Sequence, residues 1–315
     1  MPMIFSFFDP RYDQDAKPSM LFCLRQGLPP MPTSLLQPRL SCRVAVAVLA
    51  LLTVSIANGG AAQTLSQPMA TSSTSTSNSS SLPSRGRGFL AQHGVMLGGG
   101  VYVAPEYEGS DKVEATPIPF LMFNVGERIV VDPSGVEVTL MNRDALSFRM
   151  SGRYEPGRKE GDSAALRGLG DIDDSARFGA TLSYEIETME LYGTVETDVG
   201  GSDGTQAIAG AVFKCTTGRL LVTAGFSATW SDDKYMSSYF GVTSAQSARS
   251  GLATYRAGAG LKRADVELAA TYMFDDHWML RGQVGLGYLL GDAADSPIVK
   301  REAQPNAVFL VGYRF

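Results

Sequence analysis

Cysteine and histidine are scarce in this chain. Its 315 residues include three Cys and two His, and Cys23 and Cys42 both fall within the first 62 positions. If those positions are removed, Cys215 is the one thiol that stays, so no disulfide framework is expected. A Ser-His-acid hydrolase requires a His base and a zinc site requires clustered His and Cys ligands, whereas His93 and His277 lie far apart in the sequence. We therefore expect a protein that is not an enzyme and that holds no metal or cofactor.

The chain also lacks an apolar run of the length that a membrane-spanning helix needs. The uncharged run Val44–Ile56 has about 13 residues, against roughly 20 for a spanning helix. Basic residues precede this run and the small residues of "NGGAA" follow it, which is the order found in a secretory signal peptide. We predict that residues 1–62 are an N-terminal extension and a cleaved signal peptide, with a membrane anchor as the alternative. Translation starts at Met1 or at Met31, and Met31 would give a signal of normal length.

Positive charge is outnumbered by negative charge. The chain has 27 basic and 32 acidic residues, and removing residues 1–62 takes away five basic and three acidic ones, which leaves 22 against 29. A net charge of −7 makes nucleic acid a poor partner. The next stretch, residues 63–88, is rich in Ser, Thr and Asn and has no apolar period, so we predict a disordered spacer.

From residue 89 to residue 315 the dominant pattern is strict alternation of apolar and polar residues. Segments such as "ARFGATLSYEIET" and "HWMLRGQVGLGYLL" place apolar side chains on one face of a strand and polar ones on the other. Turn sequences such as "DPSG" and "GGSDG" separate these segments, and no convincing helical period follows residue 87. We predict an all-β antiparallel fold with strands near 94–104, 115–125, 128–132, 135–142, 145–154, 176–188, 189–199, 205–215, 218–230, 253–263, 265–274, 277–290 and 306–315.

Such alternation fits a soluble sandwich or a transmembrane β-barrel, in which the apolar faces point to lipid and the polar faces line the lumen. Aromatic residues at the ends of the apolar faces favour the barrel, because they resemble interfacial girdles: Tyr154, Trp230, Phe274, Trp278, Tyr288 and Tyr313. Bacterial barrels have even strand numbers, so twelve strands are expected from the thirteen candidates, with ten or fourteen possible and a bulge hidden within 253–274. The longest connections are expected at 155–175, 231–252 and 291–304.

The polar faces mix both signs of charge, which predicts mutual pairing that narrows or fills the lumen, with a selective pore as the alternative. The expected lumen charges are Arg149, Arg153, Arg177, Glu185, Glu187, Glu190, Glu196, Asp198, Arg219, Glu267 and Arg281. The chain ends on a further apolar alternation, "NAVFLVGYRF". Its residues Phe309, Val311, Tyr313 and Phe315 resemble the C-terminal signal by which the barrel-assembly machinery recognises outer-membrane proteins.

Four stretches resemble one known family. They are "GGGVYVAPEYEGSD" (98–111), "LRGLGDIDDSARFG" (166–179), "DDKYMSSYFGVTSAQSARSGLATYRAGAG" (232–260) and "YLLGDAADSPIV" (288–299). Together they are similar to signature stretches of the MipA/OmpV family, and the resemblance covers about residues 90–315. The matching motif positions are Tyr107, Gly109, Tyr235, Tyr239, Phe240, Gly241, Asp292, Ser296 and Pro297.

The resemblance implies a Gram-negative outer-membrane barrel surrounded by lipid and lipopolysaccharide. It also implies a scaffold that joins a lytic murein transglycosylase to a peptidoglycan synthase, although members of the family differ in role. A narrow channel for small solutes and a surface adhesin therefore stay open as alternatives. The family carries no catalytic motif that could be transferred to residues of this chain.

Overall fold

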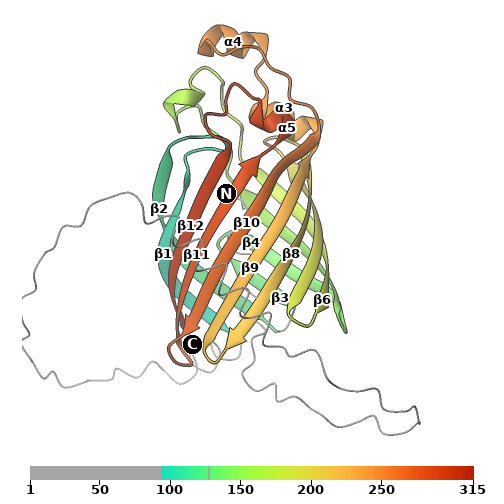
Figure 1. Ribbon diagram of the computed structural model, residues 1–315, viewed down its shortest axis with the longest axis vertical. Coiled ribbons are helices and arrows are strands. Elements are labelled where there is room, and N and C mark those ends of the chain that lie inside the picture. Colours follow the sequence, from blue (N-terminus) through green and yellow to red (C-terminus); the bar gives the residue numbers. More distant parts are fainter. Residues whose placement is uncertain (1–93, 127) are drawn as a thin grey trace, which may run out of the picture.

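A computed structural model of the chain describes residues 94–126 and 128–315, which form a closed barrel of twelve antiparallel strands (Figure 1). Each strand pairs with its neighbours in sequence, and β1 pairs with β12 to close the barrel. The predicted fold class and strand number are confirmed; the predicted signal peptide and spacer lie outside the described residues. The strands are β1 (Val95–Pro105), β2 (Val113–Val125), β3 (Ile129–Asp132), β4 (Gly135–Arg143), β5 (Leu146–Glu155), β6 (Ser175–Ile186), β7 (Met189–Val199), β8 (Thr205–Thr217), β9 (Leu220–Ser231), β10 (Gly260–Met273), β11 (Trp278–Leu289) and β12 (Ala303–Arg314).

The two ends of the barrel differ. At the turn end, where β12 finishes, the connections are tight and use left-handed backbone at Asp144, Glu187 and Gly218. At the loop end four connections are long (106–112, 156–174, 232–259 and 290–302), residues 200–204 form a short one, and all the helices of the described residues lie there (Figure 1). These helices are η1 (Ala164–Leu166), α3 (Asp233–Phe240), α4 (Ser244–Ser250) and α5 (Gly291–Ala294). No helix in the described part of the chain is long and apolar enough to cross a membrane.

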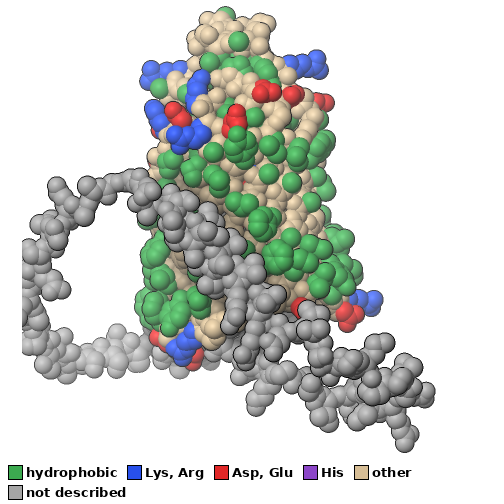
Figure 2. Space-filling model, viewed as in Figure 1, with side chains coloured by type: hydrophobic (Ala, Val, Ile, Leu, Met, Phe, Trp, Pro, Cys, Tyr) green, Lys and Arg blue, Asp and Glu red, His purple; other side chains and the backbone are tan. Residues whose placement is uncertain are grey.

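The alternation in the sequence sets the two faces of the barrel wall. Outward side chains form an apolar belt around its middle, while Lys, Arg, Asp and Glu gather at the two ends (Figure 2). Aromatic residues border this belt on both sides, as expected for interfacial girdles. Those exposed at the loop end are Tyr154, Trp230 and Tyr288, and those exposed at the turn end are Tyr184, Phe274 and Trp278.

Three details of the element prediction were wrong or incomplete. The segments 253–263 and 265–274 are not two strands, because residues 253–259 are irregular and one strand, β10, covers the rest with a register shift between Leu261 and Arg263. The weakest candidate, 128–132, is a real but short strand, β3. Helices α3 and α4 carry no helical period that sequence reading could detect. They are seven or eight residues long and are stabilised at their N-termini by the side chains of Asp232 and Thr243.

The inside of the barrel is not uniformly polar. At β1, β2, β11 and β12, inward apolar side chains pack together in the half of the barrel nearer the turn end. We call this set the turn-end cluster: Met96, Ile118, Phe120, Met122, Met279, Val308 and Leu310. Gly98 and Gly100 in β1 allow the close strand approach at this wall, because an added Cβ at either position would lie 2.0 Å from a carbonyl oxygen of β12.

The C-terminal strand closes the barrel as predicted. Phe309 and Val311 point outward, with 53% and 38% of their surface exposed, and Tyr313 packs edge-on against Trp278 at 5.0 Å between ring centroids. The backbone N–H of Phe315 donates to the carbonyl of Val95 at 3.0 Å, so even the last residue is tied to β1. Recognition of these residues by the assembly machinery stays a prediction.

Candidate functional site: the loop cap and the lumen

The family-motif positions, which lie far apart in the sequence, meet at the loop end. They occur in loops 106–112, 232–259 and 290–302, which pack with loop 156–174 over the barrel mouth; we call these four loops the loop cap. Two apolar clusters hold the cap together. One contains Tyr235, Met236, Phe240, Ala257, Leu289 and Ala293, and the other contains Tyr107, Leu166, Leu169, Val242 and Ile298.

Loop 106–112, which connects β1 to β2, is hydrogen-bonded to the loop before β12. The Tyr107 hydroxyl donates to the carbonyl of Ile298 at 3.0 Å, and the Gly109 N–H donates to Oε1 of Gln304 at 2.9 Å. The Gly109 carbonyl in turn accepts from the N–H groups of Lys300 and Arg301. Gly109 has a φ of +105°, and a Cβ there would lie 2.7 Å from Cγ2 of Val299, so both backbone conformation and space require glycine.

Under this loop lies a buried ion pair. The Lys262 ammonium is 3.1 Å from Oε1 of Glu108, and the Tyr235 hydroxyl donates to Oε2 of the same carboxylate at 3.4 Å. Lys262 also donates to the Tyr235 hydroxyl at 3.2 Å and lies 4.4 Å from the centre of its ring. Burial would raise the pKa of Glu108, but the charges of Lys262 and Arg263 outweigh it and hold this pKa below its ordinary value.

The tyrosines of the α3 motif form a stack beside this pair. The rings of Tyr235 and Tyr239 are 4.5 Å apart and nearly parallel. Burial, followed by the nearby Glu155 carboxylate, raises the pKa of Tyr239 to about 12. The Arg158 guanidinium lies 5.9 Å from the Tyr239 ring and donates to the Tyr239 carbonyl at 2.6 Å, which ties loop 156–174 to α3.

The other motif positions satisfy backbone groups of the cap. Asp292 accepts the Gly258 N–H at 2.8 Å, and the Ser296 hydroxyl donates to the Phe240 carbonyl at 2.6 Å. Gly241 ends α3, and a Cβ there would lie 2.4 Å from the Ser237 carbonyl. The Pro297 carbonyl accepts from the Lys300 ammonium at 3.1 Å. The motif residues therefore act on one another, which is the pattern of a structural cap.

Below the cap, charged residues of β5–β8 form ion pairs inside the barrel. Arg177 binds Asp198 through two nitrogens, at 2.6 and 3.1 Å, and lies 3.2 Å from Glu155. Arg153 pairs with Glu196, and Arg149 lies 3.3 Å from Glu190. Lys214 bridges Glu190 and Glu185 at the turn end, at 2.8 and 3.4 Å. The expected lumen charges of these strands thus lie beside partners of opposite sign.

Arg281 differs from these residues. It is 4% exposed, and its guanidinium donates to the Thr271 hydroxyl at 3.1 Å and to Oε1 of Gln283 at 2.8 Å. Two other expected lumen charges lie at the turn end instead of within the wall: Glu187 occupies the turn between β6 and β7, and Arg219 that between β8 and β9.

Sequence reasoning missed Glu108, Arg158 and Lys262. The one available signal was Lys262 itself, a charge next to Arg263 that interrupts the alternation of β10.

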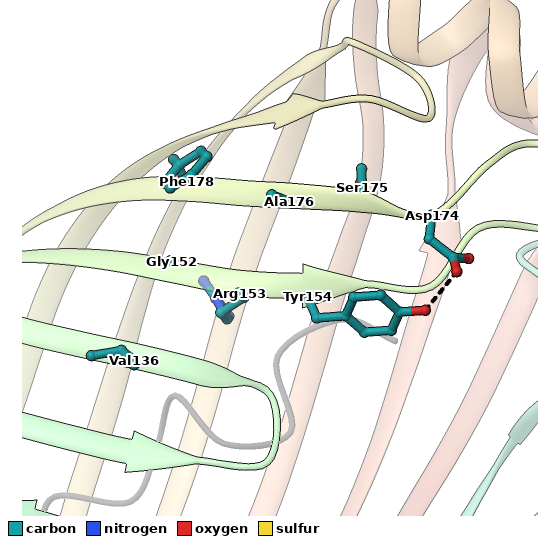
Figure 3. Close-up of a pocket in the computed structure, with 8 residues that line it drawn as sticks. All are labelled: Val136, Gly152, Arg153, Tyr154, Asp174, Ser175, Ala176 and Phe178. Carbon is teal, nitrogen blue, oxygen red and sulfur yellow. Dashed lines mark hydrogen bonds between the residues drawn. The ribbon is translucent and has the colours of Figure 1, made fainter.

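The outer surface has one groove of interest, of about 490 Å³, across β4, β5 and β6 (Figure 3). Its floor is formed by the small residues Gly152 and Ala176, and its sides by Val136, Tyr154 and Phe178. At its loop end the Tyr154 hydroxyl donates to Oδ2 of Asp174 at 2.7 Å. This groove opens onto the apolar belt and has no arrangement of catalytic groups.

His277 lies in the turn between β10 and β11. Oδ1 of Asp275 accepts the N–H groups of His277 and Trp278, and the His277 ring stacks on Tyr313 at 5.4 Å. These contacts are those of a turn residue at the edge of the apolar belt. His93 lies outside the described residues. Within the described ranges, no three His, Cys, Asp or Glu side chains are grouped as metal ligands would be.

Among solved structures, the chain is similar in fold to OmpT of Vibrio cholerae, at 9% identity with 70% of this chain and 96% of that one covered and a TM-score of 0.34. It is likewise similar to OprD of Pseudomonas aeruginosa, at 10% identity with 70% and 66% covered and a TM-score of 0.35. Similarity at this level carries no inference about function.

Comparison with known sequences is more specific. The chain is 24% identical over 225 residues to the putative outer membrane protein YiaT of Escherichia coli K12. The aligned region covers 69% of this chain and 89% of that protein. It is 28% identical over 214 residues to the MltA-interacting protein of Escherichia coli K12, with 65% and 84% covered. The family model described as MltA-interacting protein MipA matches residues 97–315, the whole described barrel except its first residues. The chain therefore belongs to the MipA family of outer-membrane β-barrels, as the sequence resemblance predicted.

Proposed function

We propose that this barrel is a non-enzymatic scaffold that binds a murein hydrolase at the periplasmic face of the outer membrane. The observation that carries the proposal is the family match over residues 97–315, together with a relative named for its interaction with MltA. The interior supports this role, because charges along β5–β8 are paired with one another, the turn-end cluster packs inside the barrel and the loop cap packs over its mouth. A protein partner would then bind at one of the two ends of the barrel.

The turn end is the face that a periplasmic enzyme would meet. Outer-membrane barrels have short periplasmic turns and longer extracellular loops, so the loop cap is assigned to the cell exterior. The turn end exposes a ring of charges of both signs, which suits a wet and reversible protein contact. Its exposed members include Arg143, Asp144, Glu187, Arg219, Asp276 and Arg314.

Affinity capture tests the proposal. Mature protein in mild detergent should retain a purified lytic transglycosylase from the same cell envelope, and the double variant Arg143→Glu/Asp276→Lys should weaken that binding about tenfold or more. Arg256→Glu is the matched control, because Arg256 is an exposed charge at the loop end. Equal loss in both variants, or no capture by the wild-type protein, would contradict a scaffold that acts through its turn end.

A narrow channel is the second candidate, and the polar wall formed by β5–β8 favours it. A small polar cavity of about 20 Å³ lies at the turn end between Ser147, Ser183, Glu190 and Lys214. It has the volume for a single water molecule and not for a solute. Planar-bilayer recording separates the two candidates, since a channel gives discrete conductance steps and a scaffold gives none.

A further inference from the structure

The outer groove across β4, β5 and β6 arises from the order of large and small residues on the outward face of these strands (Figure 3). In the β5–β6 ladder, Tyr154 lies opposite Ala176 and Gly152 lies opposite Phe178, so each pair joins a large side chain to a small one. On its other side Gly152 lies opposite Val136 of β4. The two small residues are therefore diagonal neighbours, and the space above them extends from Val136 toward the loop end of β6.

The walls of the groove are open to the membrane and are held in place by contacts within the protein. Tyr154 and Phe178 are 59% and 53% exposed. The Tyr154 hydroxyl donates to Oδ2 of Asp174 at 2.7 Å, and Oδ1 of the same carboxylate accepts the Gly157 N–H at 2.8 Å. Because these bonds fix the Tyr154 ring, little side-chain ordering is needed when a ligand enters the groove.

The position of the groove in the apolar belt indicates what fills it. Tyr154 belongs to the aromatic girdle at the loop end, so the groove lies just inside the hydrocarbon layer. Its volume of about 490 Å³ is within the range of about 300–1,000 Å³ that is usual for ligand sites. Inside a bilayer an apolar groove binds through van der Waals packing, because its ligand does not leave water. A flexible hydrocarbon chain can follow a groove between two rings, whereas a second barrel would have to insert a matching ridge.

From these observations we propose that the groove binds one acyl chain of a membrane lipid in the leaflet beside the loop end. Tyr154 and Ala176 contact the part of the chain nearest the head group, and Phe178 packs against its side. The surrounding bilayer supplies the ligand, and the shape of the groove holds it longer than a flat part of the belt does. The site lies on the side wall of the barrel, so it is independent of whether the turn end binds a murein hydrolase.

Photolabelling tests the groove. Mature protein is reconstituted into phospholipid vesicles that contain a trace of phosphatidylcholine with a diazirine in one acyl chain. After illumination, adducts on β5 and β6 are counted by mass spectrometry and compared with adducts on β12. Strand β12 is a matched reference within the same molecule, because its outward Phe309 is 53% exposed, the same fraction as Phe178.

Two leucine variants separate the groove from general lipid contact. Gly152→Leu fills the groove, and the barrel can accept it because a Cβ at Gly152 would lie 3.6 Å from the nearest atom, Cε1 of the Phe178 ring. Gly193→Leu is the matched control. Gly193 is exposed on β7 between the outward residues Leu191 and Val195, and a Cβ there meets nothing within 4 Å.

In the wild-type protein, adducts on β5 and β6 should exceed those on β12 by about threefold or more, because a packed chain exchanges more slowly than annular lipid. Gly152→Leu should remove this excess, and Gly193→Leu should retain it. Equal labelling in the wild-type protein, or an excess that survives in Gly152→Leu, overturns the proposal. If the wild-type protein is a dimer in detergent and Gly152→Leu is a monomer, a second copy fills the groove and the proposal fails. Should Gly152→Leu show no heat-dependent gel shift, Ala176→Leu replaces it, since Ala176 is an exposed residue of the same floor.

Discussion

Replacing Arg177 by Ala should destabilise the barrel more than any other single charge removal in the lumen. The Arg177 side chain is 6% exposed, and it binds Asp198, which is 2% exposed, and Glu155, which is 13% exposed. Asp198 also accepts a hydrogen bond from the Ser202 hydroxyl at 2.7 Å. That single hydrogen bond does not compensate for the loss of the guanidinium. The variant would remove the guanidinium that both carboxylates contact and would leave the buried Asp198 without that cation.

Removing one partner of a buried ion pair costs about 3–5 kcal/mol, because the remaining charge stays desolvated. With a urea dependence of about 2–3 kcal/mol/M, the unfolding midpoint of Arg177→Ala should fall by about 1–2 M. The assay is urea unfolding of refolded protein in detergent, followed by tryptophan fluorescence and by the shift in gel mobility between unheated and heated samples.

The matched control is Lys159→Ala. Lys159 lies 3.8 Å from Asp173, with side chains 43% and 89% exposed, and exposed pairs contribute about 0–1 kcal/mol. Its midpoint should therefore stay close to that of the wild-type protein. If Arg177→Ala costs no more than Lys159→Ala, the lumen is well hydrated and the reasoning that treats its ion pairs as buried filling is wrong.

Four further outcomes are expected. Gly109→Ala should loosen the loop cap by about 1–3 kcal/mol, seen as faster limited proteolysis, whereas Gly161→Ala, where a Cβ meets nothing within 4 Å, should not. Asp232→Ala should remove the cap of α3 and cost about 0.5–2 kcal/mol locally, seen as faster amide exchange at residues 233–240, with α4 unchanged. The pKa of the Glu108 carboxyl is lowered, so its ion pair contributes fully to cap stability above the unfolded pKa of about 4.3, and this contribution is lost as pH falls through the lower folded value. Protease resistance of the cap should drop in that pH range. Glu108→Gln should abolish this pH dependence. Deletion of Phe315, whose N–H pairs with Val95, should reduce heat-modifiable barrel in membranes severalfold without changing the partner affinity of the molecules that do assemble.

Strand positions and the faces of the wall were predictable because side-chain period 2 and burial are local properties of the sequence. The pattern alone gave thirteen candidate segments, because β10 was divided in two, and the twelve-strand count followed from the even strand numbers of bacterial barrels. The pairing partners of the lumen charges could not be predicted, because they depend on register between strands. Arg177 meets Asp198 only because the β6–β7 register places these two residues opposite each other.

The loop cap was predictable only through the family resemblance. Its contacts join residues nearly 200 positions apart, such as Tyr107 and Ile298, and no local pattern indicates such a pair. Its helices are too short for a period, and α3 and α4 exist because Asp232 and Thr243 cap them. The turn-end cluster was not predicted for a different reason, because the general rule that barrel interiors are polar does not indicate an inward apolar set that includes Val308 and Leu310.

The most direct test of a capped, filled barrel that acts by its ends is single-channel recording of the mature protein in planar bilayers. Insertion is verified in the same preparation by the heat-dependent gel shift and by quenching of Trp230 and Trp278 with brominated lipid, since both side chains face outward. We expect verified insertion with a flat current at ±100 mV. Reproducible discrete conductance steps from wild-type protein whose insertion has been verified would contradict the account and would show that the barrel is a channel.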